Sequence, residues 1–151
     1  METGSRDQSV RELLEAVVAL VRQWTSDNTQ LAYARELGFD VSANDVRALY
    51  SMGLAGGELR PAECATYLGL TRPTTSKLLA RLESAGLVER ARSSQDGRSI
   101  VVSLTEAGAA MYAALVEAGV EHVARATEDM TSAEITRVTA AASNLVQRLR
   151  E

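Results

Sequence analysis

One stretch of this chain carries side chains suited to contact nucleic acid. If residues 71–86 form a helix, the side that carries Lys77 has small or hydroxyl-bearing side chains and a second cation, Arg81. Small and hydroxylic groups let a helix approach base edges in the DNA major groove, and flanking cations bind phosphates. We therefore predict DNA-contacting chemistry on this face. Its centre is formed by Pro73, Lys77, Ala80 and Ser84, and its flanks by Thr74, Ser76 and Arg81.

A second group of cations follows this helix. Arg90, Arg92 and Arg98 lie close together in the sequence. Among them stands Asp96-Gly97, a dipeptide typical of tight hairpin turns because glycine readily adopts positive φ. Across such a turn, Asp96 can hold the guanidinium of Arg98 in one orientation, which suits the narrow and strongly negative minor groove. The simpler alternative is a surface hairpin with ordinary charges.

Local patterns predict the elements that position these side chains. Thr71 is a good N-cap, and Pro73 falls in the first helical turn, where a missing N–H costs little. Gly86 is placed to end the helix. One stripe at i, i+3, i+4 and i+7 faces the interior, namely Thr75, Leu78, Leu79 and Leu82. For this segment taken alone, the solvated face of an ordinary helix is the alternative.

Two strands are predicted on either side of the turn, over residues 87–92 and 99–104. The second strand is predicted to pack its alternate residues on one face and to turn those between them outward, the packed set being Ile100, Val102 and Leu104. Because a short helix precedes Thr71, the order is helix, turn, helix and ribbon. That order predicts a winged helix-turn-helix lobe over residues 42–104, in a fold that is mainly α with a small β-hairpin wing.

These segments resemble the MarR family of bacterial transcription regulators. The matching residues are 63–83 (Glu-Cys-Ala-Thr-Tyr-Leu-Gly-Leu-Thr-Arg-Pro-Thr-Thr-Ser-Lys-Leu-Leu-Ala-Arg-Leu-Glu), 86–90 (Gly-Leu-Val-Glu-Arg), 96–98 (Asp-Gly-Arg) and 104–108 (Leu-Thr-Glu-Ala-Gly). The resemblance implies a homodimer that binds double-stranded DNA at a pseudo-palindromic operator, as a repressor. It also implies that Arg98, oriented by Asp96, reaches the minor groove. The major-groove readers implied by matching positions are Arg72, Pro73, Thr74, Ser76, Lys77 and Arg81.

The chain departs from the family pattern at three positions. Arg60 stands where a small capping residue is usual, although Pro61 still suits the first helical position. Cys64 occupies a position that normally carries a leucine-like core side chain. Val46 stands where a larger aromatic is common, which bears on whether a ligand cavity exists.

Dimerisation helices are predicted on both sides of the lobe, at residues 8–38 and 105–150. The lobe itself opens with a helix capped by Ser42 and broken at 53–57, and Thr131 to Glu134 forms a capping box for the last helix. Apolar stripes on the first and last helices lack partners within one small subunit, so a second copy would cover them. The predicted interface residues are Val10, Leu14, Val17, Ile135, Val138, Leu145 and Leu149.

The net charge of −4 is unevenly distributed. Residues 59–98 hold seven cations and four acids, a net charge of +3, whereas the rest of the 151-residue chain carries −7. Attraction to phosphates depends on local charge within a Debye length of roughly 8–10 Å. The acidic remainder should therefore oppose non-specific binding without removing the cationic surface.

Other classes of protein are disfavoured. A single cysteine forbids an internal disulfide, and a single histidine beside it argues against a multi-ligand metal site. No nucleophile–histidine arrangement or phosphate-binding glycine loop is visible, so we expect neither an enzyme nor a bound cofactor. No apolar run approaches a membrane span and the N-terminus resembles no export signal, which predicts a cytoplasmic protein without membrane contact.

Three alternatives concern regulation and partners. The resemblance implies that a small, mostly apolar anion could bind between the dimerisation helices and the lobe; candidate lining residues are Trp24, Tyr33, Phe39, Tyr50 and His122. The alternative to a DNA-binding regulator is a winged-helix module that binds other proteins and not DNA. The cations Lys77, Arg81 and Arg98 argue against it, because a module without DNA binding does not need all three. A redox regulator acting through Cys64 is the third, against the simpler interpretation of an inert core thiol.

Overall fold

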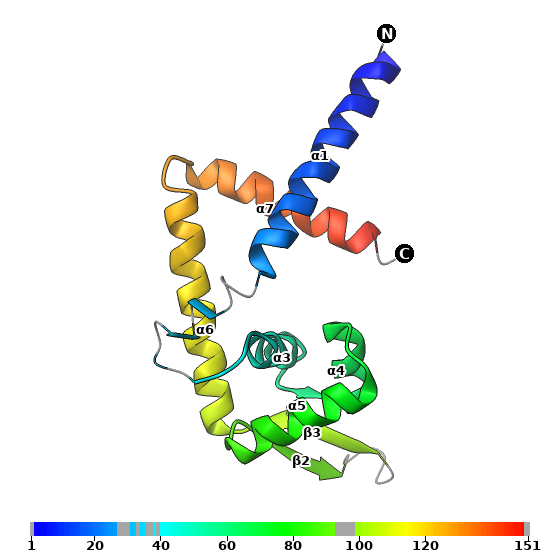
Figure 1. Cartoon of the computed structure of the whole chain (residues 1–151). Helices are drawn as coiled ribbons and strands as arrows, with labels where there is room; N and C mark the ends of the chain where they lie inside the picture. Colours follow the sequence, from blue (N-terminus) through cyan, green and yellow to red (C-terminus); the bar gives the residue numbers. More distant parts are fainter. Residues whose placement is uncertain are drawn as a thin grey trace. The chain divides into compact units, whose positions relative to one another are not determined.

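The computed structural model describes residues 2–26, 31–32, 34–35, 38, 40–92 and 99–149 (Figure 1). The chain divides into two compact units, residues 1–116 and 117–151, and each is described by itself. Within the described ranges, no helix combines the length and the apolar character needed to cross a lipid bilayer.

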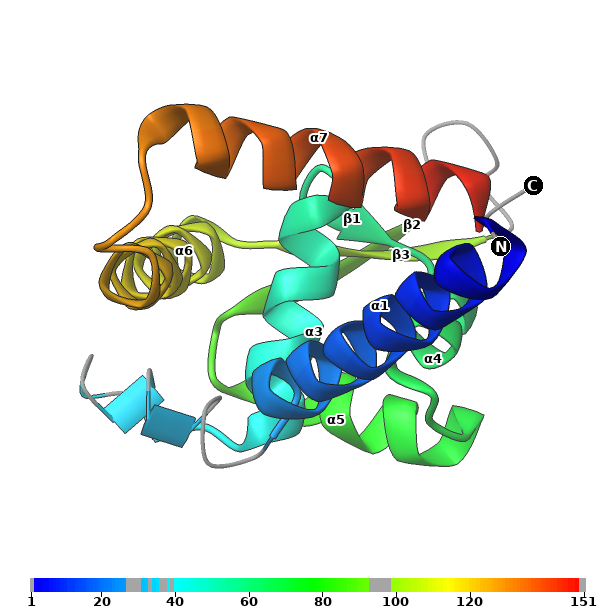
Figure 2. The same cartoon turned by 90° about the horizontal axis from the view of Figure 1, so that it is seen from above.

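Helices and short strands alternate in the lobe of the first unit. Its helices are α3 (Ala43–Leu54), α4 (Pro61–Leu68) and α5 (Arg72–Ser84), and its strands are β1 (Glu58–Leu59), β2 (Val88–Arg92) and β3 (Ile100–Leu104). Within this lobe α3 contacts α4, α5, β1 and β3 (Figure 1, Figure 2). The predicted order of helix, turn, helix and ribbon is confirmed.

The core of the lobe is aliphatic. From α3, the side chains of Val46, Leu49 and Met52 have no exposed surface. The predicted inner stripe of α5 is confirmed, since Thr75, Leu78, Leu79 and Leu82 are at most 3% exposed. Burying a leucine-sized side chain stabilises a fold by about 1.5–3 kcal/mol. The inner stripe therefore fixes which face of α5 is turned outward.

The ends of α5 follow from local hydrogen bonds. The Thr71 hydroxyl accepts a bond from the backbone N–H of Thr74 at 3.3 Å, which confirms Thr71 as the N-cap. The buried Thr75 hydroxyl donates to the Thr71 carbonyl at 3.0 Å, so the core holds no unsatisfied oxygen there. After the C-cap Ala85, Gly86 has a φ of 72°, a left-handed conformation that favours glycine and confirms its predicted role.

The strands form an antiparallel sheet with the order β1-β3-β2. Arg92 pairs with Ile100 at the open end of the β2–β3 ribbon. The predicted packing of β3 is partly wrong, because Ile100 is 52% exposed and Val101 only 6%. Ile100 lies beyond the packed part of the sheet. Since neighbouring strand residues face opposite sides, the burial of both Val101 and Val102 means that both faces of β3 are covered at that level.

Two predicted helix boundaries are also corrected. α1 (Glu2–Trp24) begins before residue 8, so the helix extends through polar residues ahead of its apolar stripe. Gly53 lies inside α3 rather than in a break. A methyl group at Gly53 would overlap the ring of Tyr112 in α6 (Glu106–Ala126), so the bare glycine leaves room for this ring against α3.

The start of α6 is tied to the loop that precedes β2. The Thr105 hydroxyl donates to the Gly86 carbonyl at 2.6 Å and accepts from the Gly108 N–H at 3.0 Å. The backbone N–H of Thr105 donates to the Leu87 carbonyl at 3.1 Å. One threonine therefore caps α6 and attaches it to the base of the ribbon.

The second unit contains the end of α6 and the helix α7 (Ser132–Arg148). The predicted capping box is confirmed: the Glu134 carboxylate accepts from the Thr131 N–H at 2.8 Å, and the Thr131 hydroxyl accepts from the Glu134 N–H at 3.3 Å. Hydrogen bonds from the backbone and side chain of Thr131 lower the pKa of Glu134. No described residue of α7 is buried, so its apolar stripe is at least partly exposed in the single chain.

Candidate nucleic-acid interface

The outward face of α5 presents small, hydroxylic and cationic side chains. Lys77 lies at its centre, and every residue predicted for this face is exposed. The hydroxyls stay close to the helix: Ser84 donates to the Ala80 carbonyl at 2.9 Å, and the hydroxyl of Thr74 lies 2.8 Å from that of Thr71. Such a face can come close to base edges without a large side chain in the way. The exposed residues are Arg72, Pro73, Thr74, Ser76, Lys77, Ala80, Arg81 and Ser84.

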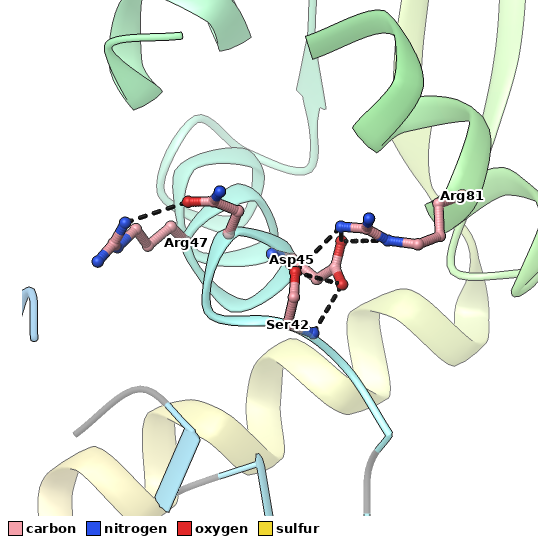
Figure 3. Close-up of polar contacts among 5 residues, drawn as sticks. Ser42, Asp45, Arg47 and Arg81 are labelled. Atoms are coloured by element: carbon pink, nitrogen blue, oxygen red, sulfur yellow. Dashed lines mark hydrogen bonds and ion pairs between the residues drawn. The ribbon is translucent and has the colours of Figure 1, made fainter. Parts of the chain in front are cut away.

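Arg81 differs from the other cations of α5 because it is bound to a buried acid. Its Nη2 lies 2.6 Å from Oδ1 of Asp45, and its Nε donates to the same oxygen at 3.2 Å. Nη2 also donates to the hydroxyl of Ser42 at 3.0 Å (Figure 3). The sequence predicted Arg81 as a DNA contact, and this stays a prediction. The structure adds that Arg81 is bound to the first turn of α3 while its side chain stays 57% exposed.

Arg90 reaches from β2 to α5. Its Nε lies 3.3 Å from a carboxylate oxygen of Glu83, and its Nη2 donates to the carbonyl of Ser76 at 3.5 Å. The ion pair is partly exposed, so it contributes little to stability, in the range of about 0–1 kcal/mol. Its effect is to place a strand cation beside the outer face of α5.

A surface groove of about 560 Å³ gathers cations from three elements. Arg60 comes from the start of α4, Arg72 from α5 and Arg90 from β2, while Leu79 and Ile100 contribute apolar surface. The sequence predicted Arg72 and Arg90 as DNA contacts, and the structure brings them to one site. Arg60, which departs from the family pattern at a capping position, was not predicted as a DNA contact. Its side chain makes no capping bond, while its backbone N–H donates to Glu63 at 2.7 Å. Guanidinium groups around one groove suit phosphate or carboxylate oxygens.

The tip of the ribbon is not part of the described structure. Asp96 and Arg98 lie outside the described residues, so their predicted roles stay predictions. Arg92 is exposed at the last position of β2, directly before the undescribed segment.

The candidate ligand-lining residues have separate surroundings. The Tyr50 hydroxyl donates to the Leu115 carbonyl at 2.6 Å, and its ring meets that of Tyr112 edge-on at 5.9 Å. Trp24 and His122 are half-buried, the former in the first unit and the latter in the second. Tyr33 and Phe39 lie outside the described residues. The sequence missed Tyr112, which packs on Tyr50 from 62 residues further along the chain.

Cys64 is buried in the lobe. Its side chain is 1% exposed, and this burial raises the pKa of the thiol. A protonated, inaccessible thiol reacts slowly with oxidants, as predicted for a core cysteine.

The residues predicted for dimerisation are accessible in the single chain. Val10 and Leu14 of α1 are 51% and 62% exposed, and Val138 and Leu149 at the other end are 59% and 76% exposed. Ile135 is 38% exposed, whereas Val17 and Leu145 are half-buried. These values leave apolar surface for a partner.

Comparison with known sequences identifies the lobe. Residues 39–99 match the model of the MarR family. Over 78 residues the chain is 36% identical to YfiV of Bacillus subtilis (strain 168), an uncharacterised HTH-type transcriptional regulator. That match covers 52% of this chain and 49% of the relative, so the chain spans about half the length of the curated relative.

Solved structures extend the likeness to most of the chain. A mutant MarR from E. coli is 25% identical with a TM-score of 0.67, covering 88% of this chain and 96% of that one. A MarR family protein from Bacillus stearothermophilus, 20% identical, has a TM-score of 0.74 with 97% of each chain covered. A mutant MarR from E. coli complexed with operator DNA is 26% identical, with a TM-score of 0.61 and coverage of 87% and 92%. The lobe therefore matches the MarR family over residues 39–99, and most of the chain shares the winged helix-turn-helix fold of solved MarR proteins.

Proposed function

We propose that this protein is a transcriptional regulator that binds double-stranded DNA through the outer face of α5. The observation that carries the proposal is the arginine-lined groove, which lies directly beside that face through Arg72 and Ser76. α5 would enter the major groove, where its small and hydroxylic residues meet base edges. Arg60, Arg72 and Arg90 would bind phosphates along the rim.

The wing completes the proposed contact. In this proposal Arg98, oriented by Asp96, enters the minor groove next to the site read by α5. Arg92 would contact phosphate, because it is exposed at the end of β2. A related protein of the same fold has been solved with operator DNA, which supports a similar use of the lobe here.

The DNA-binding form is proposed to be a homodimer on a pseudo-palindromic operator. Half-sites one helical turn apart need two recognition helices roughly 34 Å apart, which one lobe cannot supply. The exposed apolar residues of α1 and α7 offer the surface for pairing. Bound in this way near a promoter in the cytoplasm, the dimer would act as a repressor. A small apolar anion that changes the spacing of the two lobes would release it.

The test is selection of bound sequences from a random DNA pool, followed by titration of the enriched duplex. An inverted repeat among the selected sequences is expected. Lys77→Ala should weaken binding and lower the slope of log K against log salt by about 0.9, the value for one lost phosphate contact. The matched control is Arg137→Ala, which removes one exposed cation from α7, outside the lobe. Equal losses in both variants would mean that only total charge attracts DNA and that α5 is not the reading helix.

A further inference from the structure

The buried acid Asp45 is not one of the proposed DNA contacts, yet it binds Arg81, a cation on the DNA-facing side of α5. Asp45 is 3% exposed and lies in the first turn of α3. Its Oδ2 accepts from the backbone N–H and the hydroxyl of Ser42, each at 2.8 Å. Its Oδ1 accepts from Nε and Nη2 of Arg81. Four donors therefore hold one carboxylate, which is the arrangement that makes a buried charge tolerable.

These bonds use only part of the guanidinium. Arg81 carries five N–H groups, of which Nε and Nη2 together supply three. Those three are directed to Asp45 and Ser42. Nη1 makes no hydrogen bond to any residue that the structure describes, and the side chain is 57% exposed. The two donors of Nη1 are therefore not used by any described residue.

Arg81 lies on the side of α5 that the proposed function turns toward DNA. At 3.6 residues per turn, it is about 40° round the helix from Lys77 and one turn further along. Thr74 lies on the same flank. A phosphate beside this flank would meet the remaining edge of the guanidinium.

The first turn of α3 is itself fixed on its other side. Arg47 donates to the carbonyl of Thr25, just after the end of α1, and to the side chain of Asn44 at 3.1 Å. Figure 3 shows Arg47 and the Asp45–Arg81 pair on opposite sides of α3. Asp45 therefore stands on a helix held from both sides, which is what a support for a second side chain requires.

We propose that Asp45 is a positioning residue for DNA recognition, which holds the guanidinium of Arg81 so that Nη1 donates to a phosphate on the flank of α5. This inference rests on the proposed function. A free arginine loses side-chain entropy when it binds, whereas one already held by a planar, two-point contact loses less. The acid thus raises affinity through geometry although its charge repels DNA.

The charge of Asp45 and its positioning of Arg81 should have opposite effects on DNA affinity, so substituting Asp45 separates the two. Asp45→Asn removes a negative charge, which alone should strengthen binding to DNA. The control Glu89→Gln removes a negative charge from an exposed residue of β2 in the same lobe. We expect the control to bind the selected duplex at least as tightly as the wild type. Asp45→Asn should bind about tenfold more weakly, the order of one charge-assisted hydrogen bond, and its salt slope should fall by about one.

A second variant separates positioning from folding. Arg81→Lys keeps the charge at a mostly exposed side chain but loses the planar fork. It should also bind about tenfold more weakly. If the two residues act together, Asp45→Asn combined with Arg81→Lys should bind no worse than the weaker single variant. Thermal unfolding of the free proteins shows whether either change has disturbed the fold; if Asp45→Asn unfolds, Arg81→Lys alone decides.

Two outcomes overturn the inference while leaving the proposed function intact. One is wild-type affinity with an unchanged salt slope in Asp45→Asn or, where that variant does not fold, in Arg81→Lys. The other is full additivity of the two losses in the double variant. Failure of the proposed function looks different, because the wild-type protein itself would then enrich no sequence from the random pool.

Discussion

Replacing Gly108 with alanine tests how the recognition lobe is joined to α6. Gly108 is buried in the first turn of α6, behind the loop that leads from α5 into β2. A methyl group at this position would overlap the carbonyl oxygen of Leu87 deeply, and would lie 2.9 Å from its carbonyl carbon and 3.3 Å from Cδ2 of Leu104. The obstacle is mainly backbone, which cannot rotate away as a side chain can.

The sign of the effect depends on two opposing terms. Alanine is favoured over glycine inside a helix by about 1 kcal/mol, so an unobstructed change would stabilise the protein. Inserting a methyl group into a filled site costs about 1–3 kcal/mol, occasionally more. Moving the Leu87 carbonyl also weakens its bond to the Thr105 N–H, worth about 1 kcal/mol. We therefore expect Gly108→Ala to lower the free energy of unfolding by about 2 kcal/mol and the Tm by about 4–8 °C.

Urea unfolding followed by circular dichroism, at one fixed protein concentration, measures this difference. The matched control is Ala107→Gly at the neighbouring exposed position, which changes helix propensity alone and should cost about 1 kcal/mol or less. If Gly108→Ala proves as stable as the wild type or more stable, the close approach of α6 to Leu87 is wrong. The hydrogen bonds of Thr105 with Gly86 and Leu87 would then not explain why position 108 carries a glycine.

Three further changes test other parts of the molecule. Gly53→Ala should destabilise the protein by about 1–3 kcal/mol in the same urea assay because the new methyl overlaps the Tyr112 ring; Tyr112→Ala in the same background should recover part of the loss. Leu145→Glu should abolish operator binding without touching a DNA contact, and light scattering should show a monomer; a wild type that is already monomeric at micromolar concentration would contradict the dimer. Cys64→Ser should leave the peroxide sensitivity of DNA binding unchanged, because burial raises the pKa of the thiol and keeps the thiol protonated. If mild peroxide released the wild type from DNA while the serine variant stayed bound, the redox alternative would be supported.

The features of α5 that the sequence predicted correctly are local. The N-cap at Thr71, the inner stripe and the left-handed Gly86 each depend on residues within a few positions of one another. Short-range periodicity and capping chemistry are therefore enough to fix which face is buried and which is exposed. The strand pattern was less informative. Ile100 lies beyond the part of β3 that packs against other elements, and the alternation of apolar residues does not show where along the strand that packing begins.

What the sequence could not predict are the contacts between distant segments. Asp45 and Arg81 are 36 positions apart, and Tyr50 and Leu115 are 65 apart. Nothing in either neighbourhood requires the other, because such pairs form only when packing has brought the elements together. The sequence does contain a signal for the position of Asp45, because Ser42 and Asp45 have the spacing of a capping box. That spacing predicts the hydrogen bonds of Oδ2 with Ser42, but it does not predict that Oδ1 binds Arg81.

The structure also divides cations that the sequence treats alike. Lys77 and Arg72 are exposed residues of α5, Arg90 is bound to Glu83 at the surface, and Arg81 is held by a buried acid. A charge count gives each the same weight in attracting DNA. Their contributions to a bound complex should differ, because a held guanidinium delivers its donors at fixed positions while a free lysine supplies a mobile point charge. The cationic surface would then draw DNA to the lobe through its summed charge, and Arg81 would fix the register of α5 in the groove.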